Sequence, residues 1–303
     1  MKLSSLRDFV TVAERGSLRA AARQLAVSQP TITRSIQELE KDLGVALFER
    51  QAKGVRLTPM GEMFFRRSKA IRTEVARAQE EILQARGALH GHVTVCLSSA
   101  AHMSLLPAAI RPFRQRYPDV SVRLIDSLLP GVESQLVDGT IDCYVGPPFE
   151  GMAGELAVEK LFDNTRVVLG RKGHPLAGAT SLAQLVDAEW MTASSSSRAQ
   201  EDLLPVFARH GLPPPKVMFE AQSALSFLTV MSSTDLLMLL PIQWSQVPVF
   251  RDALQRIHVA EPLEAPQICI VQRIGLPLTP AAEYFCDMIR RAALHVHELG
   301  EAR

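Results

Sequence analysis

Short polar and forked side chains gather on one face of the segment between Ser28 and Gly44, which the spacing of its apolar residues predicts to be a helix. That face carries Gln29, Thr31, Thr33, Arg34 and Gln37. Hydroxyl, amide and guanidinium groups of this kind can hydrogen-bond to phosphate oxygens and to the edges of bases. The surface is therefore suited to non-covalent recognition of a nucleic acid.

Two consecutive helices are expected to position this surface. In the first, which Ser17 can cap, one apolar stripe is formed by Leu18, Ala21, Ala22 and Leu25. Ser28 can then cap a second helix that has Pro30 in its first turn, where a missing N–H costs nothing. Its buried face is predicted to consist of Ile32, Ile36, Leu39 and Leu43. The pair reads as a helix-turn-helix, although an ordinary helical hairpin with a solvated face would show the same spacing.

A basic turn follows the second helix. Gly54 can supply the turn, and the cations that flank it are Arg50, Lys53 and Arg56. A β-hairpin of this composition beside a helix-turn-helix is typical of a wing that touches the DNA backbone. The turn therefore favours a winged helix-turn-helix over a plain helical hairpin.

The segments SLRAAARQLAVSQPTITRSIQELEKDLGVALFER and GVRLTPMGE resemble the LysR-type transcriptional regulators. The resemblance continues through RQRYPDVSVRL, LVDGTIDCYVG, GHPLA, FARHGLPPP and PLTPAAEYF. It implies a DNA-binding regulator that is switched by a small molecule. On this basis the DNA-binding residues are expected to be Ser28, Gln29, Pro30, Thr31, Thr33, Arg34, Arg50, Lys53 and Arg56.

The same resemblance implies an α+β multidomain protein. An all-α winged helix-turn-helix at residues 1–59 and a long linker helix at 60–90 would lead into an α/β effector-binding domain at 91–303. This domain would fold like a periplasmic binding protein, with lobe I at about 91–161 and 266–303 and lobe II at about 162–265. A length of 303 residues suits domains that each bury a core.

The charge of the chain is divided unevenly. The formal net charge is only +1, yet residues 1–92 hold 16 Lys and Arg against 10 Asp and Glu, whereas residues 93–303 hold 17 against 22. A basic N-terminal part indicates that double-stranded DNA is bound there and not across the whole surface.

The sequence gives little indication of a membrane protein, a secreted protein or a metal-binding protein. Charged residues interrupt the N-terminus and polar residues interrupt the apolar run 225–244, so we expect a cytoplasmic protein without a signal peptide or membrane span. The wide spacing of the four cysteines predicts buried thiols, with no metal site and no cofactor. These cysteines are Cys96, Cys143, Cys269 and Cys286.

Catalysis is not indicated either, because the chain has no GxSxG elbow, no GxGxxG motif and no P-loop. The alternative function is that of a cytosolic small-molecule-binding protein or enzyme whose N-terminal helices serve only assembly. The helix-turn-helix, the basic wing and the charge asymmetry weigh against this alternative.

A repeat of apolar residues runs along the predicted linker helix. Its members are Phe64, Ile71, Val75, Ala78, Ile82, Ala85 and Leu89. Such a narrow seam on a charged helix is typical of a coiled coil and predicts pairing with a second copy of the chain. Packing on the chain itself is the alternative, but it would need a wider stripe. The resemblance implies a homodimer or homotetramer, and the stretch from Gly87 to His92 is expected to form the hinge.

Beyond His92 short apolar strands alternate with helices, which predicts a mostly parallel sheet. Ligands bind such sheets at the carboxyl ends of the strands. The loops expected there are 98–102, 127–131, 146–149, 192–198 and 222–227. Two of these loops contain serines that are expected to begin helices, so hydroxyls, backbone N–H groups and the positive helix end would converge on an anion.

The predicted effector is an organic acid, a carboxylate or sulfonate, whose apolar body would meet Phe149, Phe227 and Trp244. The candidate effector-binding residues are Ser98, Ser99, Ala100, His102, Ser127, Pro147, Phe149, Ser195, Ser196, Arg198, Gln222 and Phe227. The competing interpretation is that the serine runs are only loop and cap residues. A two-fold dimer predicts a near-palindromic operator, and the resemblance also allows RNA polymerase as a partner.

Overall fold

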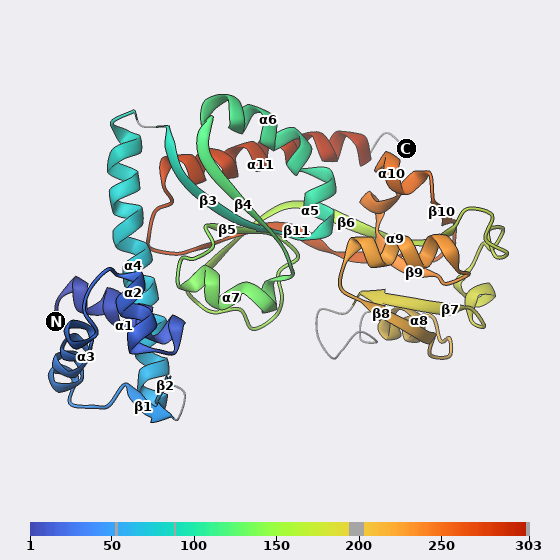
Figure 1. The fold of residues 1–303 in the computed structure, drawn as a ribbon. Helices are drawn as coiled ribbons and strands as arrows, with labels where there is room; N and C mark the ends of the chain where they lie inside the picture. The colour runs from blue at the N-terminus through green and yellow to red at the C-terminus, as the bar shows by residue number, and fades with distance from the viewer. Residues whose placement is uncertain (52–53, 88, 194–202, 301–303) are drawn as a thin grey trace. The chain divides into compact units, whose positions relative to one another are not determined.

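The computed structural model describes residues 1–51, 54–87, 89–193 and 203–300 (Figure 1). The chain forms two compact units. The first comprises Met1–Ala88 with Ser134–Ile141, and the second comprises Leu89–Glu133 with Asp142–Arg303. None of the helices in these described ranges is long and apolar enough to cross a membrane.

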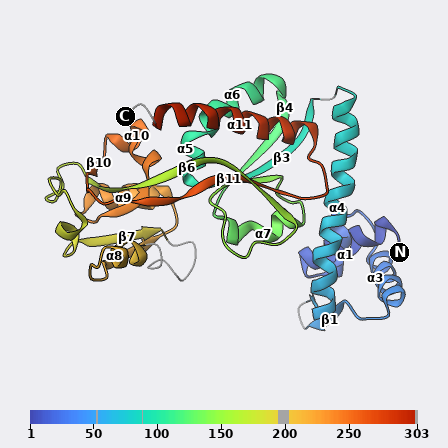
Figure 2. The ribbon, with the colours of Figure 1, turned by 180° about the vertical axis from the view of Figure 1, so that it is seen from behind.

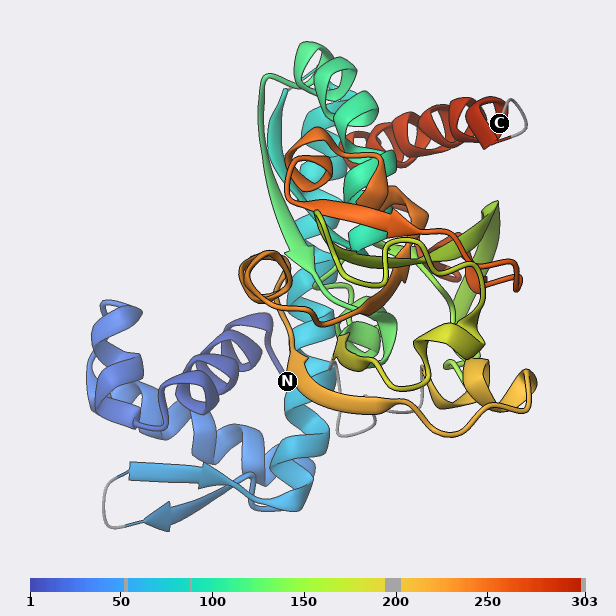
Figure 3. The same ribbon diagram turned by 90° about the vertical axis from the view of Figure 1, so that its right-hand side faces the viewer.

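The N-terminal unit is built from helices and one β-hairpin. Its elements are α1 (Leu3–Arg15), α2 (Leu18–Gln24), α3 (Gln29–Leu43), β1 (Phe48–Gln51), β2 (Gly54–Leu57) and α4 (Pro59–Ala85). Figure 3 shows the antiparallel hairpin of β1 and β2 in light blue. Phe9 of α1 is fully buried in the core, with its ring centroid 5.2 Å from that of Phe48 and 5.1 Å from that of Phe64. The hairpin and α4 are therefore packed on α1 by aromatic contacts.

Helix α4 is shorter than the predicted linker helix. It is capped by Thr58, whose Oγ1 accepts a hydrogen bond from the N–H of Gly61 at 3.0 Å, and it ends at Ala85. His90 already pairs with Asp119 at the start of the next strand, so the prediction of a hinge reaching His92 is wrong. The stretch His90-Gly91-His92 was taken for a hinge because it is polar. It forms a strand because the hydrogen bonds between strands join backbone groups, whatever the polarity of the side chains.

The second unit contains a seven-stranded sheet in the order β10-β6-β11-β5-β3-β4, with β9 pairing to β6. The strands are β3 (His90–Leu97), β4 (Asp119–Asp126), β5 (Cys143–Gly146), β6 (Leu156–Arg171), β9 (Met238–Pro241), β10 (Leu254–Ile257) and β11 (Glu264–Arg273). A separate parallel pair is formed by β7 (Glu189–Ala193) and β8 (Lys216–Ala221).

The expectation of a mostly parallel sheet is wrong for the large sheet. Strand β3 runs parallel to β4 and to β5, but β11 is antiparallel to both β5 and β6, and β6 is antiparallel to β9 and β10. Figure 2 shows the long strands β6 and β11 side by side through the middle of the unit. These two strands carry the chain out and back between two hydrophobic cores, which requires opposite directions.

The helices of this region lie between the strands in the chain, except α11, which follows the last strand. They are α5 (Ser99–Ser104), α6 (Leu106–Arg116), α7 (Leu129–Val137), η1 (Leu182–Leu185), α8 (Leu204–Arg209), α9 (Ala224–Ser233), η3 (Ile242–Ser245), α10 (Pro248–Arg251) and α11 (Pro280–Gly300). The core of lobe I includes Phe113, Phe162 and Phe285. Lobe II has two adjoining clusters, one around Trp244 and the other around Trp190.

Candidate nucleic-acid interface and ligand site

Helices α2 and α3 form the predicted helix-turn-helix. The side chains of Ser17 and Ser28 each accept a hydrogen bond of 3.3 Å from a backbone N–H in the first turn of their helix, so both predicted caps are confirmed. Between them Ala26 adopts a left-handed conformation with φ 54°, which ends α2 and redirects the chain. Helix α3 ends at Gly44, which also has a positive φ, of 70°.

One face of α3 is buried and the other is open. Ile32, Ile36 and Leu39 are buried, as predicted. The prediction for Leu43 is wrong: this last residue of the helix is 39% exposed, because it lies beyond the part of α3 that packs on the core. Thr33 is half-buried, and the exposed residues of the predicted DNA-binding set on this helix are Gln29, Pro30, Thr31 and Arg34.

Several polar groups on this face are already hydrogen-bonded. The hydroxyls of Ser28 and Thr31 lie 2.8 Å apart, and Thr33 Oγ1 donates to the carbonyl oxygen of Gln29 at 3.0 Å. Arg34 Nε donates to Glu38 Oε1 at 2.8 Å, in an ion pair whose side chains are 82% and 62% exposed. The sequence analysis missed Glu38, although its spacing of four residues from Arg34 is the signal of such a pair.

The structure describes two of the three cationic residues that were predicted for the wing. Arg50 is paired with Val55 and Glu49 with Arg56 across the hairpin, and both arginines are exposed. Lys53 lies outside the described residues. Gly54 has φ 145°, and a Cβ there would clash with the carbonyl oxygen of Gly16. The absence of a side chain at Gly54 thus allows the wing to lie close to the end of α1. The N–H of Val55 donates a hydrogen bond to the Gly16 carbonyl oxygen there, at 2.9 Å.

The predicted dimer seam is only partly available on α4. Ile71 and Ile82 are 38% and 61% exposed, and Val75 is half-buried. Phe64 instead packs in the core of its own unit. Leu89 lies beyond the end of α4 and packs against the core of lobe I. The seam prediction is therefore wrong for these two residues, because heptad spacing alone does not tell which apolar residues their own chain already covers.

A candidate ligand site lies at the carboxyl end of β3, where α5 begins. Ser98 is buried, and its Oγ caps α5 by accepting a hydrogen bond from the N–H of Ala101 at 3.4 Å. Ser99 is half-buried, and its Oγ accepts a hydrogen bond from Trp244 Nε1 at 3.4 Å. Because Trp244 belongs to the lobe II core, this hydrogen bond joins the two lobes.

The remaining predicted effector residues do not all gather here. Phe227 does, because it is buried with its ring centroid 5.7 Å from that of Trp244. Ala100 is buried in the lobe I core, and His102 Nδ1 lies 3.2 Å from the Ser98 carbonyl oxygen within α5. Half-buried loop positions after β4 and β5 are occupied by Ser127, Pro147 and Phe149, while Gln222 after β8 is exposed. Outside the described residues lie Ser195, Ser196 and Arg198.

Comparison with known proteins assigns both parts of the chain. Residues 3–62 match the bacterial regulatory helix-turn-helix proteins of the lysR family, and residues 86–294 match the LysR substrate binding domain. The chain belongs to the LysR family of transcriptional regulators.

Individual relatives agree with this assignment over nearly the full chain. The RuBisCO operon transcriptional regulator of Allochromatium vinosum is 27% identical and covers 98% of each chain. The regulator TdcA of Escherichia coli K12 is 24% identical over 95% of this chain and 92% of its own. The crystal structure of CbnR, a LysR family transcriptional regulator, matches 97% of this chain and 99% of its own with a TM-score of 0.70 at 23% identity. The matched proteins are regulators, which decides against the alternative of an enzyme with a helical assembly domain.

Tyr144 lies beside the candidate ligand site of this LysR-family regulator, and the sequence analysis did not single it out. Its hydroxyl donates to the carbonyl oxygen of Pro147 at 3.2 Å. A Cβ at Gly146 would clash with this hydroxyl and with the Ser98 side chain, so the glycine allows the three groups to lie together. Burial raises the pKa of Tyr144, which keeps its hydroxyl protonated as a donor. The run IDCYVG marks Tyr144 only as part of a strand.

All four cysteines of the regulator are buried and free, as predicted. Burial, aided by the charge of Asp126, raises the pKa of Cys96 to about 12. In the described part of the chain no group of three His, Cys, Asp or Glu residues is arranged to hold a metal ion.

Proposed function

We propose that this LysR-type regulator is controlled by a small organic anion, a carboxylate or sulfonate with an apolar or aromatic body, bound between the lobes at Ser99 and Trp244. The observation that carries the proposal is the hydrogen bond of 3.4 Å between Trp244 Nε1 and Ser99 Oγ. At that length the bond is weak. Both groups can donate a hydrogen bond, so an anion that accepts from both would replace a poor contact with two charge-assisted ones.

The surroundings support an effector with an apolar body. Phe227 and Phe250 flank Trp244, with ring centroids 5.7 Å and 4.6 Å from the Trp244 ring. Trp244 and Phe227 are only 1% and 6% exposed in this structure, so an effector would reach their rings as the lobes move apart. A polyhydroxy compound would leave many of its polar groups without partners against these faces, whereas an aromatic or branched acid would not.

The test uses the full chain and pairs of ligands that differ only in charge. Organic acids are screened by thermal shift beside their primary amides, and the best acid is then titrated calorimetrically into Ser99→Ala. We expect the acids alone to stabilise the protein and Ser99→Ala to weaken binding by about 1–2 kcal/mol. Ser104→Ala is the matched control, because Ser104 Oγ donates within α5 to the carbonyl oxygen of Ala100 at 2.7 Å. Equal shifts from acids and amides, or unchanged affinity in Ser99→Ala, would refute the proposal.

We further propose that the residues of the DNA-binding surface fall into two groups with different roles. Gln29, Thr33 and Arg34 read base edges, while phosphates are held by Thr31, Arg50, Lys53 and Arg56. Ser28 and Pro30 serve chiefly to start α3 in the correct place. Because Thr33 Oγ1 donates to the carbonyl oxygen of Gln29, it would act toward a base as an acceptor. In support, a protein of this fold, CbnR, has been determined in complex with its target DNA.

The part of the seam that remains on α4 is the proposed dimerisation surface. It consists of the exposed residues Ile71, Ala78, Ile82 and Ala85 and the half-buried Val75. A two-fold dimer through this seam would present two recognition helices to half-sites about 34 Å apart on a near-palindromic operator in the cytoplasm. Pairing of effector domains would extend the dimer to a tetramer, and RNA polymerase would be the partner for activation. Sedimentation of seam variants tests the assembly.

A further inference from the structure

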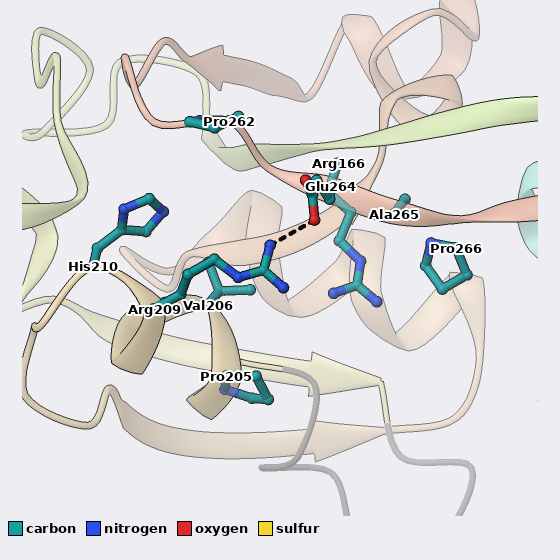
Figure 4. A pocket seen from close by; sticks show the side chains of 9 residues that line it. All are labelled: Arg166, Pro205, Val206, Arg209, His210, Pro262, Glu264, Ala265 and Pro266. Carbon is teal, nitrogen blue, oxygen red and sulfur yellow. Dashed lines mark hydrogen bonds and ion pairs between the residues drawn. The ribbon is translucent and has the colours of Figure 1, made fainter. Parts of the chain in front are cut away.

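The exposed arginines of this regulator differ in whether the chain itself supplies a partner for them. In the cavity between α8 and the start of β11, for example, Arg209 Nη1 donates to Glu264 Oε2 at 2.6 Å (Figure 4). Arg7 of the N-terminal unit is likewise paired with Asp8, at 3.0 Å. An exposed arginine that lacks such a partner carries an unbalanced positive charge, which attracts anions from outside the chain.

Two arginines of α2, Arg19 and Arg23, lack such a partner. Both are exposed, and within the described part of the chain neither makes a hydrogen bond, an ion pair or a ring contact. Their spacing of four residues makes them neighbours on one face of the helix. This face is separate from the buried face of α2, which is formed by Ala21 and Ala22.

The stability of α2 does not account for this pair. Arg19 lies in the first turn, where the helix dipole disfavours a cation, and no acidic residue lies in that turn. Arg23 in the last turn is placed favourably, but two arginines at this spacing repel each other. An anion from outside the chain would remove both disadvantages.

The wing is held against the turn that precedes α2. The N–H of Val55 donates to the carbonyl oxygen of Gly16 at 2.9 Å, and the next residue, Ser17, caps α2. The start of α2 and the turn of the hairpin are therefore neighbours.

The wing brings a third unpaired arginine to this region. Arg50 is exposed, has no partner within the described residues and lies directly opposite Val55 in the hairpin. Residues that lie opposite each other in a hairpin share one face of it. Arg50 is therefore on the face of Val55, whereas the acidic Glu49 lies on the other face, opposite Arg56.

We infer that Arg19 and Arg23 of α2 bind DNA phosphates together with Arg50 of the wing. The inference rests on the proposed placement of α3 in the major groove. When the second helix of a helix-turn-helix occupies the groove, the helix before it crosses the DNA backbone, so its arginines meet phosphate oxygens and not base edges. Guanidinium groups bind these oxygens through charge-assisted hydrogen bonds. The sequence analysis had confined the DNA-binding surface to α3 and the wing.

The test measures how binding depends on salt, because each phosphate contact contributes about 0.9 to the slope of log K against log salt concentration. Full-length Arg19→Gln and Arg23→Gln are titrated at several concentrations of potassium chloride by fluorescence anisotropy. One duplex has a random sequence, and the other is an operator selected from random sequence. Arg15→Gln is the matched control, because Arg15 is an exposed arginine at the end of α1 whose Nε already donates to Gln24 Oε1 at 2.5 Å.

We expect Arg19→Gln and Arg23→Gln each to lower the slope by about 0.9 for every protomer on the DNA. Near 0.1 M salt each should weaken binding roughly tenfold, by the same factor on both duplexes. Arg15→Gln removes the same charge from a neighbouring position and should change the slope much less. Arg19→Lys should keep most of the slope, because an ammonium group also binds phosphate. The melting temperature of Arg19→Gln should not fall, since no contact within the described chain is lost.

Three results would overturn the inference. The first is an unchanged slope in either variant, and the second is an equal change in Arg15→Gln, which would reflect the total charge of the unit and not a contact. The third is a loss confined to the operator, which would mean that these arginines read bases. If Arg34→Ala relaxes the sequence preference while Arg19→Gln and Arg23→Gln leave the slope unchanged, the α2 surface is refuted and the proposed role of α3 stands.

Discussion

The ion pair between Arg34 and Glu38 predicts that removal of a glutamate will strengthen operator binding. In the unbound protein Glu38 holds the guanidinium group of Arg34 at 2.8 Å on the open face of α3. A two-pronged contact with a guanine that uses Nε would require Arg34 to leave this partner. Glu38→Gln therefore removes a competitor for Arg34 and also a negative charge near the phosphates.

The exposure of the pair sets the size of the effect. With 82% and 62% of the two side chains exposed, solvent screens the charges, and pairs of this spacing contribute about 0.3–0.5 kcal/mol. Glu38→Gln should thus tighten operator binding by about twofold. Arg34→Ala should cost ~1–3 kcal/mol on the operator, the usual discrimination of a two-pronged base contact.

Fluorescence anisotropy on two duplexes can measure both effects. One is an operator selected from random sequence and the other is a scrambled duplex of equal length and charge. The gain from Glu38→Gln should become smaller when Arg34 is already alanine, because only the loss of a negative charge near the phosphates then remains. An equal loss on both duplexes in Arg34→Ala, or an undiminished gain in the double variant, would refute base readout by Arg34.

Three further predictions concern the wing, the seam and the thiols. Arg56→Ala should weaken binding to all duplexes alike and lower the salt slope by about one, and a selective loss on the operator would contradict a phosphate role. Val75→Glu with Ile82→Glu should dissociate the oligomer in sedimentation, whereas Leu89→Glu should lower the melting temperature of the effector domain, because Leu89 packs on the lobe I core. Since burial raises the pKa of Cys96 to about 12, its thiol should resist iodoacetamide at pH 8 in the native protein and react in guanidinium. Rapid native labelling would show that the strand opens.

The elements of the DNA-binding unit were predictable where local chemistry decides them. The caps at Ser17 and Ser28 and the end at Gly44 depend on a few neighbouring residues, and the structure has each of them. Leu43, Phe64 and Leu89 were misjudged, because a periodic pattern says that a residue is apolar but not which surface covers it. That information belongs to the packed structure alone.

The ligand region was predictable only in part, for a related reason. The rule that ligands bind at the ends of strands directed attention to Ser98 and Ser99, and the structure places both at the carboxyl end of β3, where α5 begins. It could not show that Ser98 caps a helix while Ser99 bonds to Trp244, because Trp244 is 145 residues away in the chain. The antiparallel course of β6 and β11 was also hidden, because the residues of a strand do not state the direction in which it crosses the sheet.

The contact between Ser99 and Trp244 limits what the head group of an effector can achieve. A net hydrogen bond contributes about 0.5–1.5 kcal/mol, and one of 3.4 Å lies at the weak end of that range. Full switching from 1:99 to 99:1 needs a difference of about 5.5 kcal/mol between the two arrangements of the lobes. An aromatic body that buries ~200 Å² against Phe227 and Trp244 could supply at most about 5 kcal/mol. Acetate should therefore bind weakly and leave DNA binding unchanged, while an aromatic acid with the same carboxylate should switch it. Titrations of the protein–operator complex would decide this point, because equal switching by both acids would mean that the body of the effector plays no part.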